Sequence, residues 1–284
     1  LLNPVTKTCP IFRSRRDAEI TKAVYGRVSV LGRSEWRVEL KFPLDVGRES
    51  GAFSSESRDG RLPLYEGKYF HQYNHRWVTN DGESDRPLTD GEVSDPTCSI
   101  RPRHWYPAEE VLRRFGTTWH HSWVLAWRDI ARSTDERTFI ASVVPSLAVA
   151  HSAWLIFVAE TEVPLAPVLL SNINSFPLDF IARQKVGGTH MSAFIVDQLP
   201  VLGPSTYEGA AGWSADKSVR EWILPRVLEL TYSAWDLSPF AQDLGYEGAP
   251  FRWSPERRFL LRCEIDAAFF QLYGFSRDDT DYVM

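Results

Sequence analysis

The densest group of chemically capable side chains lies in residues 62–77, LPLYEGKYFHQYNHRW. Asp59 and the triplet Glu66-Gly67-Lys68 follow the acid plus Glu-x-Lys pattern with which many nucleases bind Mg²⁺ and activate water. Two carboxylates would hold the ion, and the lysine would steady the attacking hydroxide. Because so short a triplet often arises by chance, an Mg²⁺-dependent nuclease using Asp59, Glu66 and Lys68 is kept as an alternative function.

The histidines of this segment suggest a metal site, but their spacing argues against one. His71 and His75 are four residues apart, and the alternating aromatic residues around them favour a strand. In a strand, residues four apart lie about 13 Å from each other, too far to share one ion. We therefore expect no metal site, even with His120 and His121 as further ligands.

The same alternation predicts a surface that could read DNA. On a strand from residue 65 to 77, one face would carry Lys68, Gln72, Asn74 and Arg76. These side-chain types pair with base edges or phosphates. A solvated polar face over an aromatic core would give the same pattern, and both readings remain open from this stretch alone.

Three further stretches place basic or polar donors beside aromatic residues, in polar turns or next to a glycine pair whose bare backbone could approach a phosphate. We predict DNA contacts from their members, Arg101, Arg103, Arg128, Arg132, Arg137, Lys185, Thr189 and His190. The formal net charge of −5 does not exclude this, because nucleic-acid binding needs only a local basic strip.

Composition indicates a folded protein. The chain has 284 residues, of which 43% are hydrophobic, and 11 Trp, 10 Tyr and 16 Phe are more aromatic residues than a core of this size needs. Three cysteines lie far apart without a Cys-x-x-Cys pair, which disfavours a disulfide framework or a zinc site and fits a reducing cytoplasm. We expect no membrane partner, because no apolar run approaches about 20 residues and no secretory signal opens the chain.

Local patterns predict an α+β fold with a mixed or antiparallel sheet, followed by a helical C-terminal portion. Ser14, with Asp17 three residues later, is expected to cap a helix over residues 15–28. Further helices are expected over 168–186, interrupted at Pro177, and over 216–235 and 254–274. Strands are expected over 36–40, 65–77, 121–127, 137–145, 153–158 and 191–196, with 153–158 central and a mobile loop over 79–97.

These elements divide the chain into two parts. Residues 1–202 would form a sheet-containing domain, and residues 213–284 would form the helical C-terminal portion, joined by the Gly-rich segment 203–212. The chain begins at Leu1 without an initiator Met, and we interpret it as a piece of a longer protein.

Missing motifs limit the chemistry of the chain alone. No Gly-x-Gly loop follows an early strand to hold S-adenosylmethionine, and no Asn-Pro-Pro-aromatic motif is present to hold a flipped adenine. No Gly-x-Ser-x-Gly nucleophile motif occurs either. We therefore expect no catalytic residues for methyl transfer or serine hydrolysis in this chain.

Five ordered blocks resemble a known family. The chain is similar to the region that follows the catalytic domain in large adenine-N6 DNA methyltransferases, the fused bacterial restriction–modification enzymes of the type IIG kind and their relatives in the phage-defence systems BREX and DISARM. The blocks are NPVTKTCPIFRSRRDAEITKAVY (3–25), residues 62–77 quoted above, WRDIARSTDERTFIASVVP (127–145), NINSFPLDFIARQKVGGTHMSAFIVDQLPVL (172–202) and ILPRVLELTYSAWDLSPFAQDLGYEGAPFRW (223–253).

This resemblance implies a target recognition domain that binds double-stranded DNA sequence-specifically. It also implies that an upstream methyltransferase domain of the parent chain holds S-adenosylmethionine and the catalytic motif, so that no cofactor belongs to this chain. A third possibility is a protein-interaction module that docks other defence subunits through the aromatic helices after Trp213.

Overall fold

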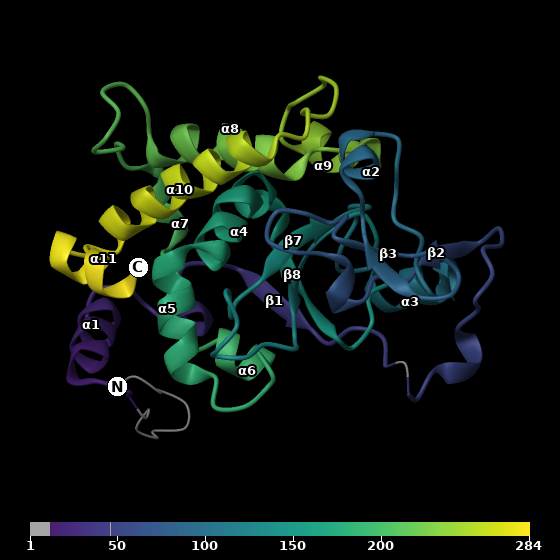
Figure 1. Ribbon diagram of the computed structural model, residues 1–284, viewed down its shortest axis with the longest axis horizontal. Helices are drawn as coiled ribbons and strands as arrows, with labels where there is room; N and C mark the ends of the chain where they lie inside the picture. Colours follow the sequence, from purple (N-terminus) through teal and green to yellow (C-terminus); the bar gives the residue numbers. More distant parts are fainter. Residues whose placement is uncertain (1–11, 46) are drawn as a thin grey trace.

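The chain folds as antiparallel sheets flanked by helices, which confirms the predicted α+β class and the helical C-terminal portion (Figure 1). The computed structural model describes residues 12–45 and 47–284. Buried residues of the sheet and of the C-terminal helices belong to one hydrophobic cluster, which extends from Ile20 to Tyr273. The helical portion therefore shares its core with the sheet.

The main sheet has four antiparallel strands in the order β1-β8-β6-β7. They are β1 (Val38–Lys41), β6 (Val124–Arg128), β7 (Ala141–Val144) and β8 (Ala153–Val158). β8 lies between β1 and β6, and the predicted central position of 153–158 is confirmed. Its run of apolar residues on both faces is typical of a strand that is covered on both sides.

Two small hairpins extend beside this sheet. β2 (Arg61–Pro63) pairs with β5 (Trp105–Pro107), which leads directly into α3 (Ala108–Phe115). β3 (Val78–Asn80) pairs with β4 (Asp85–Pro87). The segment 79–97 is therefore not the plain loop that its polar composition predicts.

The reason is local capping chemistry within that polar segment. α2 (Asp90–Ser94) follows β4, and Thr89 forms a capping box with Glu92 at its start. Glu92 also forms an ion pair with Arg86. Polar side chains here build short elements by hydrogen-bonding the backbone, which composition alone does not reveal.

The helices begin with α1 (Arg15–Tyr25), where the predicted capping box of Ser14 and Asp17 is confirmed. The expected helix over 168–186 is two helices, α4 (Ala166–Asn174) and α5 (Phe176–Lys185). Pro177 lies in the first turn of α5, where proline is tolerated because that N–H has no helical partner.

The C-terminal portion consists of helices that cover α4 and α5, with α10 lying along α5 and α8 (Figure 1). Ser254 caps α10 as predicted, and Pro225 lies inside α8. The helices of this portion are α8 (Val219–Thr231), α9 (Ser238–Asp243), α10 (Pro255–Leu272) and α11 (Arg277–Val283), and α6 (Ala193–Val196) and α7 (Pro204–Glu208) precede them in the chain. Short 3₁₀ turns are Leu31–Arg33, Ser50–Ala52, Gly67–Tyr69, Glu160–Leu165 and Trp235–Leu237.

The strand predicted over 191–196 is wrong. Residues Ala193–Val196 form α6, and the amide of Val196 donates to the carbonyl of Ser192 within the same turn. Short apolar runs of this length fit a strand or a buried helical turn equally well.

Among the described residues, no single helix has both the length and the apolar character needed to cross a membrane. The bent pair Glu160–Asn174 and Phe176–Lys185 reaches that length and composition only jointly, with a 61° bend between its halves.

The strand predicted over 65–77 is also wrong, and Gly67 is one reason. Gly67 lies in a 3₁₀ turn, where its amide donates to Ser152 Oγ at 2.8 Å. A Cβ on Gly67 would lie 2.4 Å from the backbone oxygen of Ser152. The glycine of the Glu-Gly-Lys triplet is therefore required by this close approach to the end of the β7–β8 connection.

We predict that Gly67→Ala destabilises the protein by about 1–3 kcal/mol, because backbone must move to admit the methyl group. Urea unfolding would measure it. Gly91→Ala is the matched control, since no atom lies within 4 Å of the added Cβ and alanine favours the helix α2. Equal stability of wild type and Gly67→Ala would contradict this account of the triplet.

Candidate functional site

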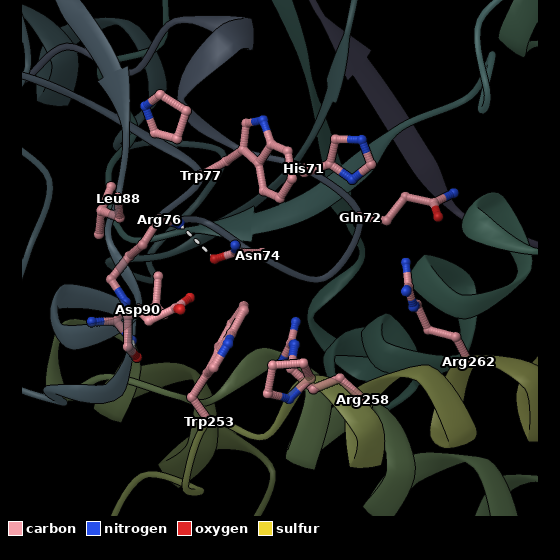
Figure 2. Close-up of a pocket in the computed structure, with 13 residues that line it drawn as sticks. His71, Gln72, Asn74, Arg76, Trp77, Leu88, Asp90, Trp253, Arg258 and Arg262 are labelled. Carbon is pink, nitrogen blue, oxygen red and sulfur yellow. Dashed lines mark hydrogen bonds between the residues drawn. The ribbon is translucent and has the colours of Figure 1, made fainter.

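A pocket with a cavity volume of about 340 Å³ opens between three segments of the chain (Figure 2). Its walls come from residues 71–77, from residues 87–93 around the start of α2, and from residues 253–262 at the start of α10. We call it the arginine–tryptophan pocket, defined by His71, Arg76, Trp77, Trp253, Arg258 and Arg262.

The first wall is a tight turn rather than a strand. The amides of His71 and Asn74 each donate to the carbonyl of the other, at 2.8 and 2.9 Å. Tyr73 sits in the turn with a φ of 58°, in the left-handed region that few side chains adopt. This turn ends the alternation on which the predicted DNA-reading face depends.

Arg76 is a structural residue that joins the first wall to the second and to Ser233 of the helical portion. Its guanidinium is buried and donates to the carbonyls of Asp95 at 2.8 Å, Cys98 at 2.7 Å and Ser233 at 3.0 Å, with further bonds to the carbonyls of Glu92 and Val93. These carbonyls and the Ser233 hydroxyl accept from its two terminal NH₂ groups, whereas its Nε has no partner among the described residues, and no carboxylate there forms an ion pair with it. The predicted phosphate contact by Arg76 does not fit this burial.

Gln72 and Asn74 line the pocket, but both are 4% exposed. Gln72 Nε2 donates to the carbonyls of Phe139 and Asn174, at 3.2 and 3.1 Å. Asn74 Oδ1 accepts the amide of Arg76 at 2.9 Å. The predicted common face is therefore wrong, because the turn separates these residues from Lys68, which is held by Glu66 and Asp85 at 3.0 and 2.7 Å.

Two arginines one turn apart on α10 form the opposite wall. Arg258 lies over the ring of Trp253, 3.9 Å from its centroid, and donates to the carbonyls of Leu230 and Tyr73. Burial of its guanidinium, with the nearby charges of Arg262 and Arg76, lowers the pKa of Arg258 to about 9. Arg262 forms no hydrogen bond or ion pair with any residue that the structure describes.

The positive charge around the pocket affects the pKa of His71. Burial, with smaller contributions from the charges of Arg128, Arg262 and Arg137, lowers the pKa of His71 to about 4. Its ring packs on Trp77 with the centroids 4.7 Å apart. Among the described residues that line the pocket, Asp90 is the single acid. The pocket is therefore cationic and aromatic while His71 itself is neutral near pH 7.

Arg128 and Arg137 lie behind the pocket rather than in it. Arg128 Nε donates to the carbonyl of Phe70 at 2.8 Å, and burial lowers the pKa of Arg128 to about 10. Arg137 pairs with Asp266 at 3.1 Å and lies over Phe176, 4.1 Å from the ring centroid. Both are positioned to contribute charge to the pocket more than direct contacts to DNA.

The other predicted DNA contacts lie on two other surfaces. Arg101 and Arg103 are exposed beside the β3–β4 hairpin, where their backbone bonds Asn80 and Tyr69. That hairpin also supplies Pro87 to the pocket, so these two arginines lie on elements that continue from its rim.

The second surface follows β6 and α5. Arg132, Thr189 and His190 are exposed, and His190 Nδ1 bonds Asp129 at 2.5 Å. Lys185 lies over the ring of Tyr25 at 4.8 Å from its centroid, and burial lowers the pKa of Lys185 to about 8. Asp129 also accepts from Trp154 Nε1 at 2.9 Å.

The residues of the nuclease alternative do not form a metal site in the described part of the chain. Glu66 and Asp85 are both paired with Lys68, whereas Asp59 is exposed in the turn before β2. No group of three or more His, Cys, Asp or Glu side chains among the described residues is arranged to hold a metal ion.

Comparison with known proteins adds no assignment. No protein-family model matches the chain, and no curated protein matches it. The function is therefore argued from the geometry of the pocket.

The sequence reasoning missed Trp253, Arg258 and Arg262. The spacing of Arg258 and Arg262 places them on one face of a helix that the sequence predicts, so the sequence could have predicted that they lie close together. The sequence could not have predicted their position opposite His71, because nearly 190 residues of chain separate the two walls.

We predict that acidification destabilises the protein through His71. The folded state holds His71 neutral down to about pH 4, while the unfolded chain binds its proton near its ordinary pKa of 6.5. The unfolded state therefore gains protons first, and stability falls as pH drops from about 6.5 to 4, by up to about 3 kcal/mol.

Urea unfolding of wild type and His71→Asn between neutral pH and about pH 4.5 would measure this contribution. The variant should lose less stability than wild type over that interval. The same pH dependence in both proteins would show that His71 is not held neutral.

Proposed function

We propose that this chain is the DNA target recognition part of an adenine-N6 methyltransferase, and that it holds duplex DNA over the arginine–tryptophan pocket and the adjoining β3–β4 hairpin. The observation that carries the proposal is the composition of the pocket. Its lining holds three arginines and two tryptophans against a single acid, in a protein whose net charge is −5. Arginine beside an exposed aromatic ring is the combination that binds phosphates and stacks on bases.

Exposure decides which of the predicted contacts the proposal retains. Arg101, Arg103 and Arg132 are exposed, and their guanidinium groups form no hydrogen bond or ion pair with the residues that the structure describes. Arg76, Arg128 and Arg137 are engaged in the interior and support the surface rather than touch DNA. Base reading is assigned to the exposed residues and to the floor of the pocket.

The proposal leaves chemistry to the parent protein. S-adenosylmethionine and the catalytic motif would belong to the upstream methyltransferase domain, with both parts working in the cytoplasm. The nuclease alternative is less well supported, because Lys68 is held by two acids in an ion-pair network that stabilises the fold.

The interaction-module alternative has one observation in its favour. Large apolar side chains of the helical portion are exposed, Trp235 at 49% and Phe259 at 57%. Neither side chain lines the pocket, so contact of these residues with a protein partner would be compatible with DNA binding at the pocket.

We predict salt-sensitive binding of duplex DNA. If about three phosphates are contacted, affinity should fall about 40-fold between about 50 and 200 mM salt, because bound counterions are released. Fluorescence anisotropy of a labelled duplex would measure it. Undetectable binding at low salt, or binding indifferent to salt, would overturn the proposal.

The double variant Arg101→Gln/Arg103→Gln should weaken binding and reduce the salt slope by about two. Arg15→Gln/Arg277→Gln is its matched control, since it removes the same charge from α1 and α11, which lie at the other end of the molecule from the β3–β4 hairpin (Figure 1). An equal loss in both double variants would mean that overall charge, rather than the hairpin, determines binding.

A further inference from the structure

We infer that the arginine–tryptophan pocket takes a single nucleotide unit, with its phosphate at Arg258 and Arg262 and its base among the rings of Trp77, His71 and Trp253. This deepens the proposed function by naming the ligand of the pocket, and it rests on that function only for the source of the nucleotide. The ligand is either a free nucleoside monophosphate or a nucleotide displaced from a DNA strand.

The positive charges of the pocket favour an anionic ligand. Arg258 donates to carbonyl oxygens and lies over a ring, and no carboxylate forms an ion pair with it among the described residues. The like charges of Arg262 and Arg76 affect its pKa more than the opposite charge of Glu229 does. Positive charge that is removed from water without a directly bonded counter-charge is costly. A phosphate between Arg258 and Arg262 would relieve that cost and would accept several of their N–H groups.

The aromatic rings of the pocket favour a planar ligand. Trp77 is 44% exposed although it packs on His71, so one of its faces is open to a ligand. Figure 2 shows Trp77 and His71 on one side of the pocket and Trp253 and Arg258 on the opposite side, with Asn74 between them. A base between these sides could stack on aromatic or guanidinium planes.

Asn74 supplies a directional donor at the floor of the pocket. Its Oδ1 accepts the amide of Arg76, and this bond fixes the orientation of the side-chain amide. Its Nδ2 forms no hydrogen bond with the residues that the structure describes, and it remains available to an acceptor on a base edge.

Size agrees with a nucleotide. The cavity of about 340 Å³ is at the lower end of the range of small-molecule pockets, about 300–1,000 Å³. Inorganic phosphate would leave the rings unused, and a purely apolar ligand would leave the arginines without a counter-charge. Charge and rings together favour a ligand that carries both an anion and a base.

Isothermal titration calorimetry with deoxyadenosine monophosphate would test this at low salt and neutral pH. Wild type should bind, and Arg262→Gln should weaken the affinity about 10-fold or more, because a charge-assisted contact to phosphate is lost. Arg262 has no bond within the described residues to lose, so this variant should fold normally, as a thermal melt would check. Arg257→Gln, which removes an exposed charge one residue from Arg258 on the same helix, should bind as wild type does.

The variant Trp77→Leu tests the contribution of the base to affinity separately from that of the phosphate. It should weaken deoxyadenosine monophosphate about fivefold or more through lost stacking, while binding of inorganic phosphate stays unchanged. No heat of binding in wild type, equal affinity in Arg262→Gln, or equal affinity for phenyl phosphate and the nucleotide would each overturn the inference.

Two duplexes of one sequence, perfect or with one unpaired nucleotide, distinguish the sources. A DNA source predicts tighter binding of the duplex with the unpaired nucleotide, and loss of that preference in Trp77→Leu. Equal binding of both duplexes, beside binding of free nucleotide, assigns the pocket to a free nucleotide. Duplex binding without any nucleotide binding would overturn the inference and leave the proposed function standing. Nucleotide binding without any duplex binding would overturn the proposed function and leave the inference standing.

Discussion

The candidate site depends on one buried guanidinium. Arg76 donates to carbonyl oxygens of the 92–98 segment and of Ser233, so a single side chain joins the 71–77 turn, the segment that contains α2 and the helical portion. A buried charge with only neutral acceptors is costly to desolvate, and burial lowers the pKa of Arg76. The charge of Asp236 offsets part of that cost without a direct bond. Arg76 thereby fixes two walls of the pocket against each other and against the helical portion, which also carries the third wall.

The positive charge of Arg76 also shapes the chemistry of what it holds together. It raises the potential felt by Arg258, whose own charge already competes with that of Arg262. His71 is kept neutral, and Trp253 covers the guanidinium of Arg258, on which Glu229 acts without a direct bond. Arg137, in contrast, forms an ion pair with Asp266. The lack of a carboxylate bonded to Arg258 or Arg262 among the described residues is the physical reason to regard the pocket as a binding site rather than a packing defect.

The parts of the fold that sequence predicts correctly are those encoded within a few residues. The capping box of Ser14 and the cap of Ser254 are local hydrogen-bond patterns, and the apolar run 153–158 marks an interior strand by itself. The segment 65–77 could not be predicted in this way. Its turn places Tyr73 at positive φ. Position 67 requires glycine because the carbonyl of Ser152, 85 residues away in the chain, lies where a Cβ would be in close contact with it. Alternation of side chains is evidence for a strand only where no distant contact overrides it.

The turn in residues 71–77 also changes which groups the polar residues of that segment can bind. Gln72 and Asn74 are suited by type to reading base edges, yet Gln72 spends both N–H groups of its amide on carbonyl oxygens inside the protein. Only Asn74 keeps an amide N–H₂ group without a bond among the described residues, and it faces the pocket instead of a groove-reading surface. Sequence discrimination through this wall would therefore act on a nucleotide that enters the pocket, where one fixed donor and two aromatic walls can distinguish bases by shape and edge. Discrimination of paired bases would have to come from flexible exposed residues such as Arg101 and Arg103, which are not held in position by the core.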